Sequence, residues 1–125
     1  MKYVALVATL ALLEYVWFGF QVGRARQRYG VAAPATTGHP IFERYHRVHQ
    51  NTLENLVIFL PGLWLFASYV SPTIAALLGV VFIAGRAVYA RLYVADPPRR
   101  SVGVMMSFPI GLILLIGGTI GAFLR

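Results

Sequence analysis

The sequence of 125 residues contains no cysteine and only four acidic residues. Without cysteine the chain can form neither a disulfide framework nor a thiolate metal site, so any reactive thiol must come from a substrate. Charged residues make up 12% of the chain, about half their usual share in a soluble domain, and hydrophobic residues make up 58%. A protein of this composition cannot be surrounded by water alone, because one modest core cannot bury four long apolar runs, and the surplus must face lipid.

Four apolar stretches have about the 17 to 25 residues that a helix needs to cross a bilayer. We predict helices over residues 3–29, 42–69, 73–95 and 98–124, which together form a single domain over residues 1–125. The fold class expected from this pattern is an all-α membrane protein, a four-transmembrane-helix bundle. The first stretch runs into arginines without a small-residue cleavage site, so we expect a retained span and not a signal peptide.

Glycine and proline mark the ends of these helices. Gly30 should end the first helix, and the Ser71–Pro72 pair should make a tight return between the second and the third. Asp96 and the two prolines after it should stop the third helix, with Asp96 capping the fourth. Pro61 falls inside the second helix, where an interior proline usually kinks the backbone. Residues 31–40 should form an ordered loop.

Basic residues outnumber acidic ones, giving a net charge of +7, and they gather at one end of the expected bundle. The basic residues at that end are Arg24, Arg26, Arg28, Arg44, Arg47, Arg86, Arg91, Arg99 and Arg100. Only Lys2 and Arg125 lie at the other end. By the positive-inside rule the two arginine-rich connections are cytoplasmic, and we expect a bacterial inner membrane. We expect no nucleic-acid binding, because anionic lipid head groups account for the surplus charge.

The second and third helices each carry a polar stripe near the arginine end. At 100° per residue, Arg47, Asn51 and Glu54 share one face of the second helix. The third helix is apolar up to residue 84 and then carries Arg86, Tyr89 and Tyr93 on one face. The short return between the two helices places both stripes at the same depth. The sequence therefore predicts a polar pocket near the cytoplasmic interface, which Arg99 and Arg100 enter from the last connection.

The groups in this pocket suit a small zwitterionic ligand with several carboxylates. Arginine can hold a carboxylate bidentately, and Glu54 could hold an ammonium group. In the alternative interpretation, Arg44, Arg47, Arg86 and Arg91 reach out to water or phosphate, Glu54 neutralises one of them, and the tyrosines form an interfacial belt. Periodicity alone does not name the ligand.

Three blocks of residues resemble the family of membrane-associated proteins in eicosanoid and glutathione metabolism. That family includes microsomal glutathione transferases, leukotriene C synthase and the lipoxygenase-activating protein. The first block is QVGRARQRYGV (residues 21–31) leading to Thr37–Gly38, and the second is FERYHRVHQNTLE (residues 42–54). The third runs from Gly85 and Arg86 through Tyr89 to Tyr93 and continues to Arg100 and Gly103. Their order, spacing and placement on the four expected spans carry the resemblance over most of the chain.

The resemblance implies a homotrimer that binds glutathione between neighbouring subunits. One subunit would supply Arg47, Asn51, Glu54, Tyr89 and Tyr93, and the next would supply Arg26 and His49. Arg100 matches the arginine that holds the glutathione thiolate. Two positions differ from the family members that make leukotrienes, which carry glutamine at the position of His49 and tyrosine at that of Asn55. The His49–Glu54 string is instead similar to one branch of the microsomal transferases.

The function implied by the resemblance is that of a membrane-bound glutathione S-transferase with glutathione-dependent peroxidase activity, serving detoxification. A lipophilic electrophile or a lipid hydroperoxide would arrive from the bilayer, and Arg100 would stabilise the attacking thiolate. An intersubunit groove would hold this second substrate. Leu13, Trp17 and Phe20 of the first helix could line it, although such an aromatic stripe also serves plain helix packing.

Two other classes of protein compete with the enzyme. A non-catalytic lipid-presenting scaffold of the same family would bind without turnover. A small multidrug transporter would use Glu14, the lone acid inside the first helix, as a proton-coupled cation site, although the arginine-rich end would repel cationic drugs. We expect no metal, because His39, His46 and His49 lack an acidic or thiolate partner at ligand spacing.

Overall fold

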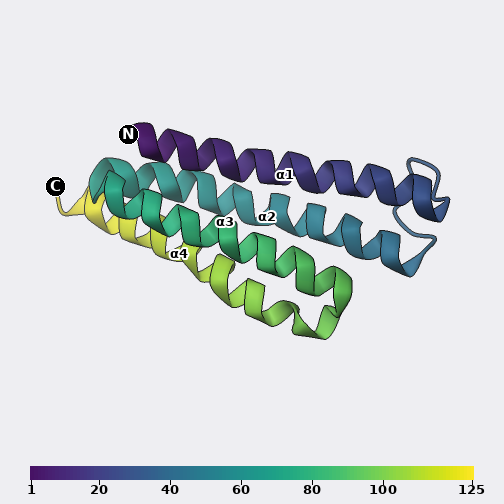
Figure 1. Cartoon of the computed structure of the whole chain (residues 1–125). Helices are drawn as coiled ribbons and strands as arrows, with labels where there is room; N and C mark the ends of the chain where they lie inside the picture. The colour runs from purple at the N-terminus through teal and green to yellow at the C-terminus, as the bar shows by residue number, and fades with distance from the viewer.

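The protein, described here by a computed structural model of residues 1–125, is a bundle of four long helices (Figure 1). The helices are α1 (Lys2–Tyr29), α2 (Pro40–Tyr69), α3 (Pro72–Ala95) and α4 (Ser101–Phe123), and a short 3-10 helix, η1 (Pro97–Arg100), precedes α4. All four long helices have the length and hydropathy needed to cross a membrane. The expected all-α bundle and its four spans are therefore confirmed.

Backbone and side-chain caps set the ends of the first three helices. Gly30 ends α1 in the left-handed conformation, with φ 68°, and its N–H donates to the carbonyl of Arg26. At the start of α2, the backbone N–H of Ile41 donates to His39 Nδ1 at 3.2 Å. At the start of α3, the N–H of Ile74 donates to the Ser71 hydroxyl, also at 3.2 Å. The glycine stop and the tight Ser71 return follow the sequence prediction.

The sequence prediction was wrong about where the fourth helix begins. An α-helix was expected from residue 98 with Asp96 as its side-chain cap, but α4 begins at Ser101, after η1. The Asp96 side chain accepts no capping hydrogen bond. Pro98 has no N–H to offer it, and the N–H of Arg99 donates instead to the Asp96 carbonyl at 2.9 Å, which winds a 3-10 turn.

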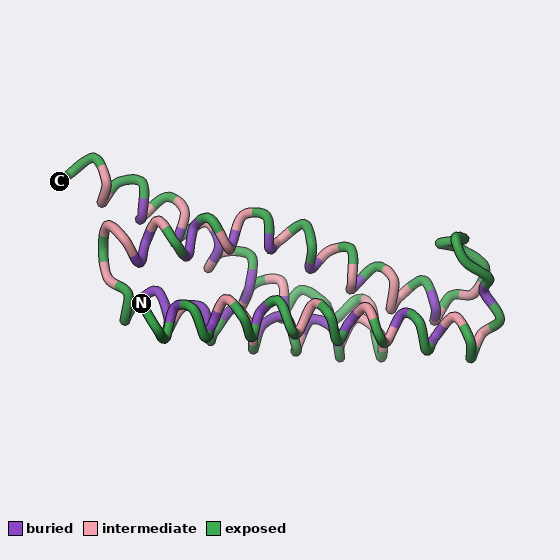
Figure 2. The backbone as a smooth tube through the Cα atoms, turned by 90° about the horizontal axis from the view of Figure 1, so that it is seen from above, coloured by how far each residue is buried: buried purple, intermediate pink, exposed green.

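The helices are arranged with α2 and α3 between α1 and α4. α1 packs on α2 and α3 from one side, and α4 packs on the same two helices from the other. The core between them includes the stacked rings of Phe59 and Phe82, whose centroids lie 3.9 Å apart. Exposed positions recur along the whole length of every helix (Figure 2). Many carry large apolar side chains, such as Leu13, Trp64 and Ile116, which suits an outer surface in lipid.

Glycines let α4 approach its neighbours at backbone distance. A Cβ atom added at Gly118 would lie 2.5 Å from the backbone nitrogen of Phe66 in α2, and one added at Gly85 would lie 2.8 Å from Met106 Cβ in α4. A Cβ at Gly103 would collide with the backbone of Tyr89 in α3. Small residues at such crossings are the usual means of packing helices closely in membranes. This seam holds α3 and α4 together beside the polar residues of both helices.

Gly103→Ala is therefore expected to destabilise the bundle by about 2 kcal/mol, because α4 must move off α3 to admit one methyl group. The measurement is the free energy of unfolding in detergent micelles. Gly23→Ala is the matched control, because an added Cβ there meets nothing within 4 Å. In a helix interior that change should be neutral or stabilising by about 0.5 to 1 kcal/mol. Equal effects of the two substitutions would contradict the close packing at Gly103.

Candidate functional site

A buried arginine forms the centre of the polar end of the bundle. Arg86 of α3 is only 1% exposed. Its guanidinium donates to Asn51 Oδ1 at 2.7 Å and Thr52 Oγ1 at 3.0 Å on α2, and to Ser107 Oγ at 3.2 Å on α4. It also lies 4.3 Å from the centre of the Tyr89 ring. One side chain thus joins three helices at the depth of the predicted pocket.

The position of Arg86 contradicts part of the alternative interpretation of the arginines, since this one does not reach out to water. The sequence places Arg86 on the stripe with Tyr89 and Tyr93 but does not identify it as a central contact. One feature of the sequence could have indicated that Arg86 is buried: two small hydroxyl residues, Thr52 and Ser107, lie on two other helices at the same depth. A buried guanidinium needs several acceptors, and these residues supply them.

The predicted face of α2 is present as one surface. Arg47 Nη1 lies 3.9 Å from Glu54 Oε1, and both side chains are more than half exposed, at 56% and 62%. Asn51 lies between them and turns inward, where its carbonyl oxygen accepts from Arg86 and, at 3.2 Å, from Asn55 Nδ2. An exposed ion pair of this length contributes little stability. Both charged groups are therefore readily available to a ligand.

The two tyrosines of α3 lie together at the same end. Tyr89 is 2% exposed and packs in a small cluster with Phe18 and Val48. Its ring stacks on that of Tyr93, with the centroids 5.5 Å apart, and Tyr93 is half-buried. Since Arg86 contacts the Tyr89 ring and also binds Asn51, the tyrosines and the α2 face are linked through the buried guanidinium.

Arg26 and His49 lie apart from these residues, on the side where α1 meets α2. Arg26 donates to the carbonyl of Ala35 at 2.6 Å, and its guanidinium lies 4.8 Å from the centre of the Phe42 ring. The His49 ring stacks on Tyr15 of α1 at 4.4 Å between centroids. Within one chain, then, these two residues do not join the group formed by Arg47 and its neighbours.

Arg100 lies at the end of η1 with an exposed side chain, and it donates to the carbonyl of Pro97 at 3.1 Å. None of the four main cavities of the chain is lined by any of the eight predicted glutathione residues. The α2 face, formed by Arg47, Asn51 and Glu54, and the Arg100 side chain lie at the surface of the single chain. No cluster of three histidine, aspartate or glutamate side chains comes together in the chain.

Glu14 faces the interior of the bundle. It lines a cavity between α1, α2 and α3, and one of its carboxylate oxygens is buried without a hydrogen-bond partner. The transporter hypothesis requires a cation to bind at Glu14, and Arg91, an exposed arginine that lines the same cavity, would repel that cation. The lining of this cavity therefore does not favour a site for a cationic drug.

The model of the MAPEG family matches residues 4–120. The chain belongs to the MAPEG family. Similar proteins are an uncharacterized protein of Synechocystis sp., 50% identical over 113 residues, and human microsomal glutathione S-transferase 2, 38% identical over 117 residues. Those alignments cover 90% and 94% of this chain, and 82% and 80% of the relatives.

A third relative, leukotriene C4 synthase of Cavia porcellus, is 36% identical to this MAPEG chain over 121 residues, which cover 94% of the chain and 81% of the relative. The family match and the four membrane-spanning helices together make this MAPEG chain an integral membrane protein. The expected family membership is confirmed.

Proposed function

We propose that the protein is a membrane-bound glutathione S-transferase that also acts as a glutathione-dependent peroxidase. The observation that carries the proposal is the similarity to human microsomal glutathione S-transferase 2 over nearly the whole chain. The second substrate is a lipophilic electrophile or a lipid hydroperoxide that reaches the protein through the bilayer. The arginine-rich connections face the cytoplasm, where glutathione is available.

Glutathione binds to the exposed α2 face in this proposal. A carboxylate of the tripeptide replaces Glu54 as the partner of Arg47, and Glu54 takes the ammonium group. Breaking the long, exposed Arg47–Glu54 pair costs little, so most of the new interaction energy favours binding. Asn51, held by Arg86, and the stacked pair of Tyr89 and Tyr93 complete the site within one subunit.

A neighbouring subunit of a homotrimer completes the site with Arg26 and His49. Two observations support this part of the proposal. Both residues contact other partners on the α1–α2 side and neither contacts the Arg47–Glu54 pair, which supports their serving the site of another subunit. The α2 face is also open surface in one chain, and a second subunit would enclose it.

Arg100 activates the thiol in this proposal. A cysteine thiol has a pKa near 8.5, so about 3% is thiolate at pH 7, and a nearby guanidinium lowers that pKa. The thiolate sulfur attacks the electrophilic carbon, a C–S bond forms, and the leaving group departs with its electron pair. With a hydroperoxide, two glutathione molecules are oxidised to the disulfide while the O–O bond is reduced to an alcohol and water. Arg100 is exposed at the end of η1 and therefore accessible to glutathione.

The test uses the purified protein in lipid nanodiscs with two substrates, a chlorodinitrobenzene and a lipid hydroperoxide, and measures glutathione-dependent turnover. Isothermal titration calorimetry measures glutathione binding in parallel. Turnover with either substrate supports the enzyme. Glutathione binding without turnover would support the lipid-presenting scaffold. The absence of both binding and turnover would refute the proposed site.

Glu54→Gln is expected to raise the KM for glutathione about tenfold while changing kcat little, because a charge-assisted hydrogen bond to the ammonium group is lost. Steady-state kinetics with varied glutathione measure this split. Glu43→Gln is the matched control on the same helix. Glu43 is exposed and accepts from the backbone N–H of Gly38, away from the α2 face. An unchanged KM in the Glu54 variant would remove this residue from the site.

A further inference from the structure

Two adjoining cavities on the side of α1 form one groove. The outer cavity, of about 440 Å³, lies at the arginine end, and the inner one, of about 320 Å³, lies deeper between α1, α2 and α3. Gln21 of α1 and Tyr45 of α2 line both cavities. We call the two together the α1 groove. Its polar end is at the membrane interface and its inner end is at the depth of the spans.

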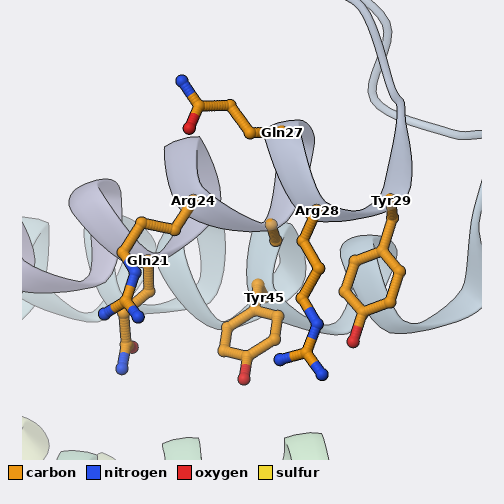
Figure 3. A pocket seen from close by; sticks show the side chains of 7 residues that line it. Gln21, Arg24, Gln27, Arg28, Tyr29 and Tyr45 are labelled. Atoms are coloured by element: carbon orange, nitrogen blue, oxygen red, sulfur yellow. The ribbon is translucent and has the colours of Figure 1, made fainter.

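The outer end of the α1 groove is cationic. Figure 3 shows the side chains of Arg24 and Arg28 extending to the same side of α1 as Tyr45, whereas Gln27 points away. The Tyr29 ring lies beside the Arg28 guanidinium, 5.5 Å from its centroid. No acidic residue lines this cavity. Two guanidiniums and two phenols without a counter-charge match the charge and hydrogen-bonding capacity of a phosphate group.

The inner end of the α1 groove is mainly apolar. Its lining includes Trp17 and Phe18 of α1, Val48 of α2, and Ala90 and Val94 of α3, and its charged residues are Glu14 and Arg91. Trp17 lies seven residues before Arg24 on the helix, which places it about 10 Å deeper in the membrane. The groove thus offers a cationic site for an anionic head group and, beside it, a mainly apolar cavity at the depth of the acyl chains.

We propose that the α1 groove binds one anionic glycerophospholipid of the surrounding bilayer. Its phosphate contacts Arg24 and Arg28, and one acyl chain lies along Trp17 and Ala87, both of which are exposed. Glu14 lines the inner cavity about 15 Å from Arg24 along the helix, at acyl-chain depth and beyond contact with the head group. This lipid is a structural ligand, bound whether or not the protein turns over glutathione.

The α1 groove is distinct from the proposed glutathione site. Arg26 follows Arg24 by two residues and therefore projects about 160° away from it around α1. None of the proposed glutathione residues lines either cavity. Failure of the glutathione proposal would therefore leave the lipid proposal intact, and the reverse also holds.

The two tryptophans of the chain allow a direct test. Trp17 lines the α1 groove, whereas Trp64 is exposed on α2 outside it. Trp64→Phe leaves Trp17 as the only reporter, and Trp17→Phe leaves Trp64. Each variant is placed in phosphatidylcholine vesicles. Increasing fractions of a brominated lipid, either phosphatidylglycerol or phosphatidylcholine, are then included in the vesicles. Quenching of tryptophan fluorescence then measures how strongly each lipid associates beside each reporter.

Trp17 is expected to show about fivefold stronger association with brominated phosphatidylglycerol than with brominated phosphatidylcholine, whereas Trp64 shows a ratio near one. One arginine near the membrane surface produces an effect of this size. Arg24→Gln with Arg28→Gln should abolish the preference at Trp17. Lys2→Gln with Arg125→Gln removes the same charge from the opposite end of the bundle and should leave it unchanged.

Ala87→Phe provides a second variant that retains both arginines. Ala87 lines the inner cavity with an exposed side chain, so a larger residue there should exclude the acyl chain and reduce quenching of Trp17 about twofold. Circular dichroism checks that each variant keeps its helices. Equal lipid preference at Trp17 and Trp64, or a preference at Trp17 that survives loss of Arg24 and Arg28, would overturn the proposal.

Discussion

Arg100→Ala is expected to lower kcat/KM for glutathione conjugation about 100-fold, which is the scale on which a single charge-stabilising donor acts. The physical reason is loss of the guanidinium that favours the thiolate over the thiol. The pH profile provides the sharper measurement. Without Arg100, the pH at which the rate is half-maximal should rise toward the ordinary thiol pKa of about 8.5. A variant that had merely lost structure would lose rate at every pH alike.

The matched control for this change is Arg99→Ala. Arg99 is the neighbouring residue of η1 and is likewise exposed, but it does not match the thiolate-binding position. Its removal should change the rate by less than about threefold, because it contributes only to the local potential. Full activity in Arg100→Ala would refute the proposed mechanism. Equal losses of activity in the two variants would show that Arg100 acts only through the general positive charge of η1.

Arg86→Ala is expected to destabilise the bundle by about 3 kcal/mol. The substitution removes three hydrogen bonds of a buried guanidinium that join α2, α3 and α4, and it leaves a cavity where the guanidinium lay. It also frees Asn51 from its main partner, so the KM for glutathione should rise in whatever fraction stays folded. Thermal unfolding in detergent micelles measures the stability, and a fall in the midpoint of about 10 °C is expected.

Arg91→Ala is the matched control for Arg86→Ala, since both arginines belong to α3 but Arg91 is exposed. Its removal should shift the midpoint by no more than about 2 °C, as expected of a surface side chain. A stability loss of similar size in both variants would show that helix propensity, and not the buried network, determines the effect. An unchanged KM in folded Arg86→Ala would show that Asn51 does not depend on this contact.

Most of the fold could be predicted because its determinants are local. The apolar runs have bilayer length, and Gly30 and Ser71 end or begin helices through backbone and side-chain bonds to residues within five positions. The start of α4 could not be placed as well. Two successive prolines after Asp96 change which N–H groups remain, and the 3-10 turn that results satisfies the Asp96 carbonyl and not its carboxylate.

The candidate site could be predicted in part. The 100° rotation per residue was enough to place Arg47 and Glu54 on one face, and their 3.9 Å contact confirms it. Periodicity cannot show which stripe residue turns inward, because that choice depends on acceptors supplied by other helices. Arg86 turns inward because Thr52 and Ser107 meet it from α2 and α4. The roles of Arg26 and His49 depend on the proposed neighbouring subunit, and that of Arg100 depends on bound glutathione, so all three stay predictions.

The glycine seam also determines how this bundle can deform. Where α4 meets α2 and α3, backbone lies against backbone at Gly103 and Gly118, and any sliding would force the main chains into each other. α1 instead contacts its neighbours through side chains such as Val7 and Phe18, which can change rotamer. The molecule therefore has one side where the main chains hold the helices in place and one side where only side chains do, and we expect α1 to tilt more readily than α4.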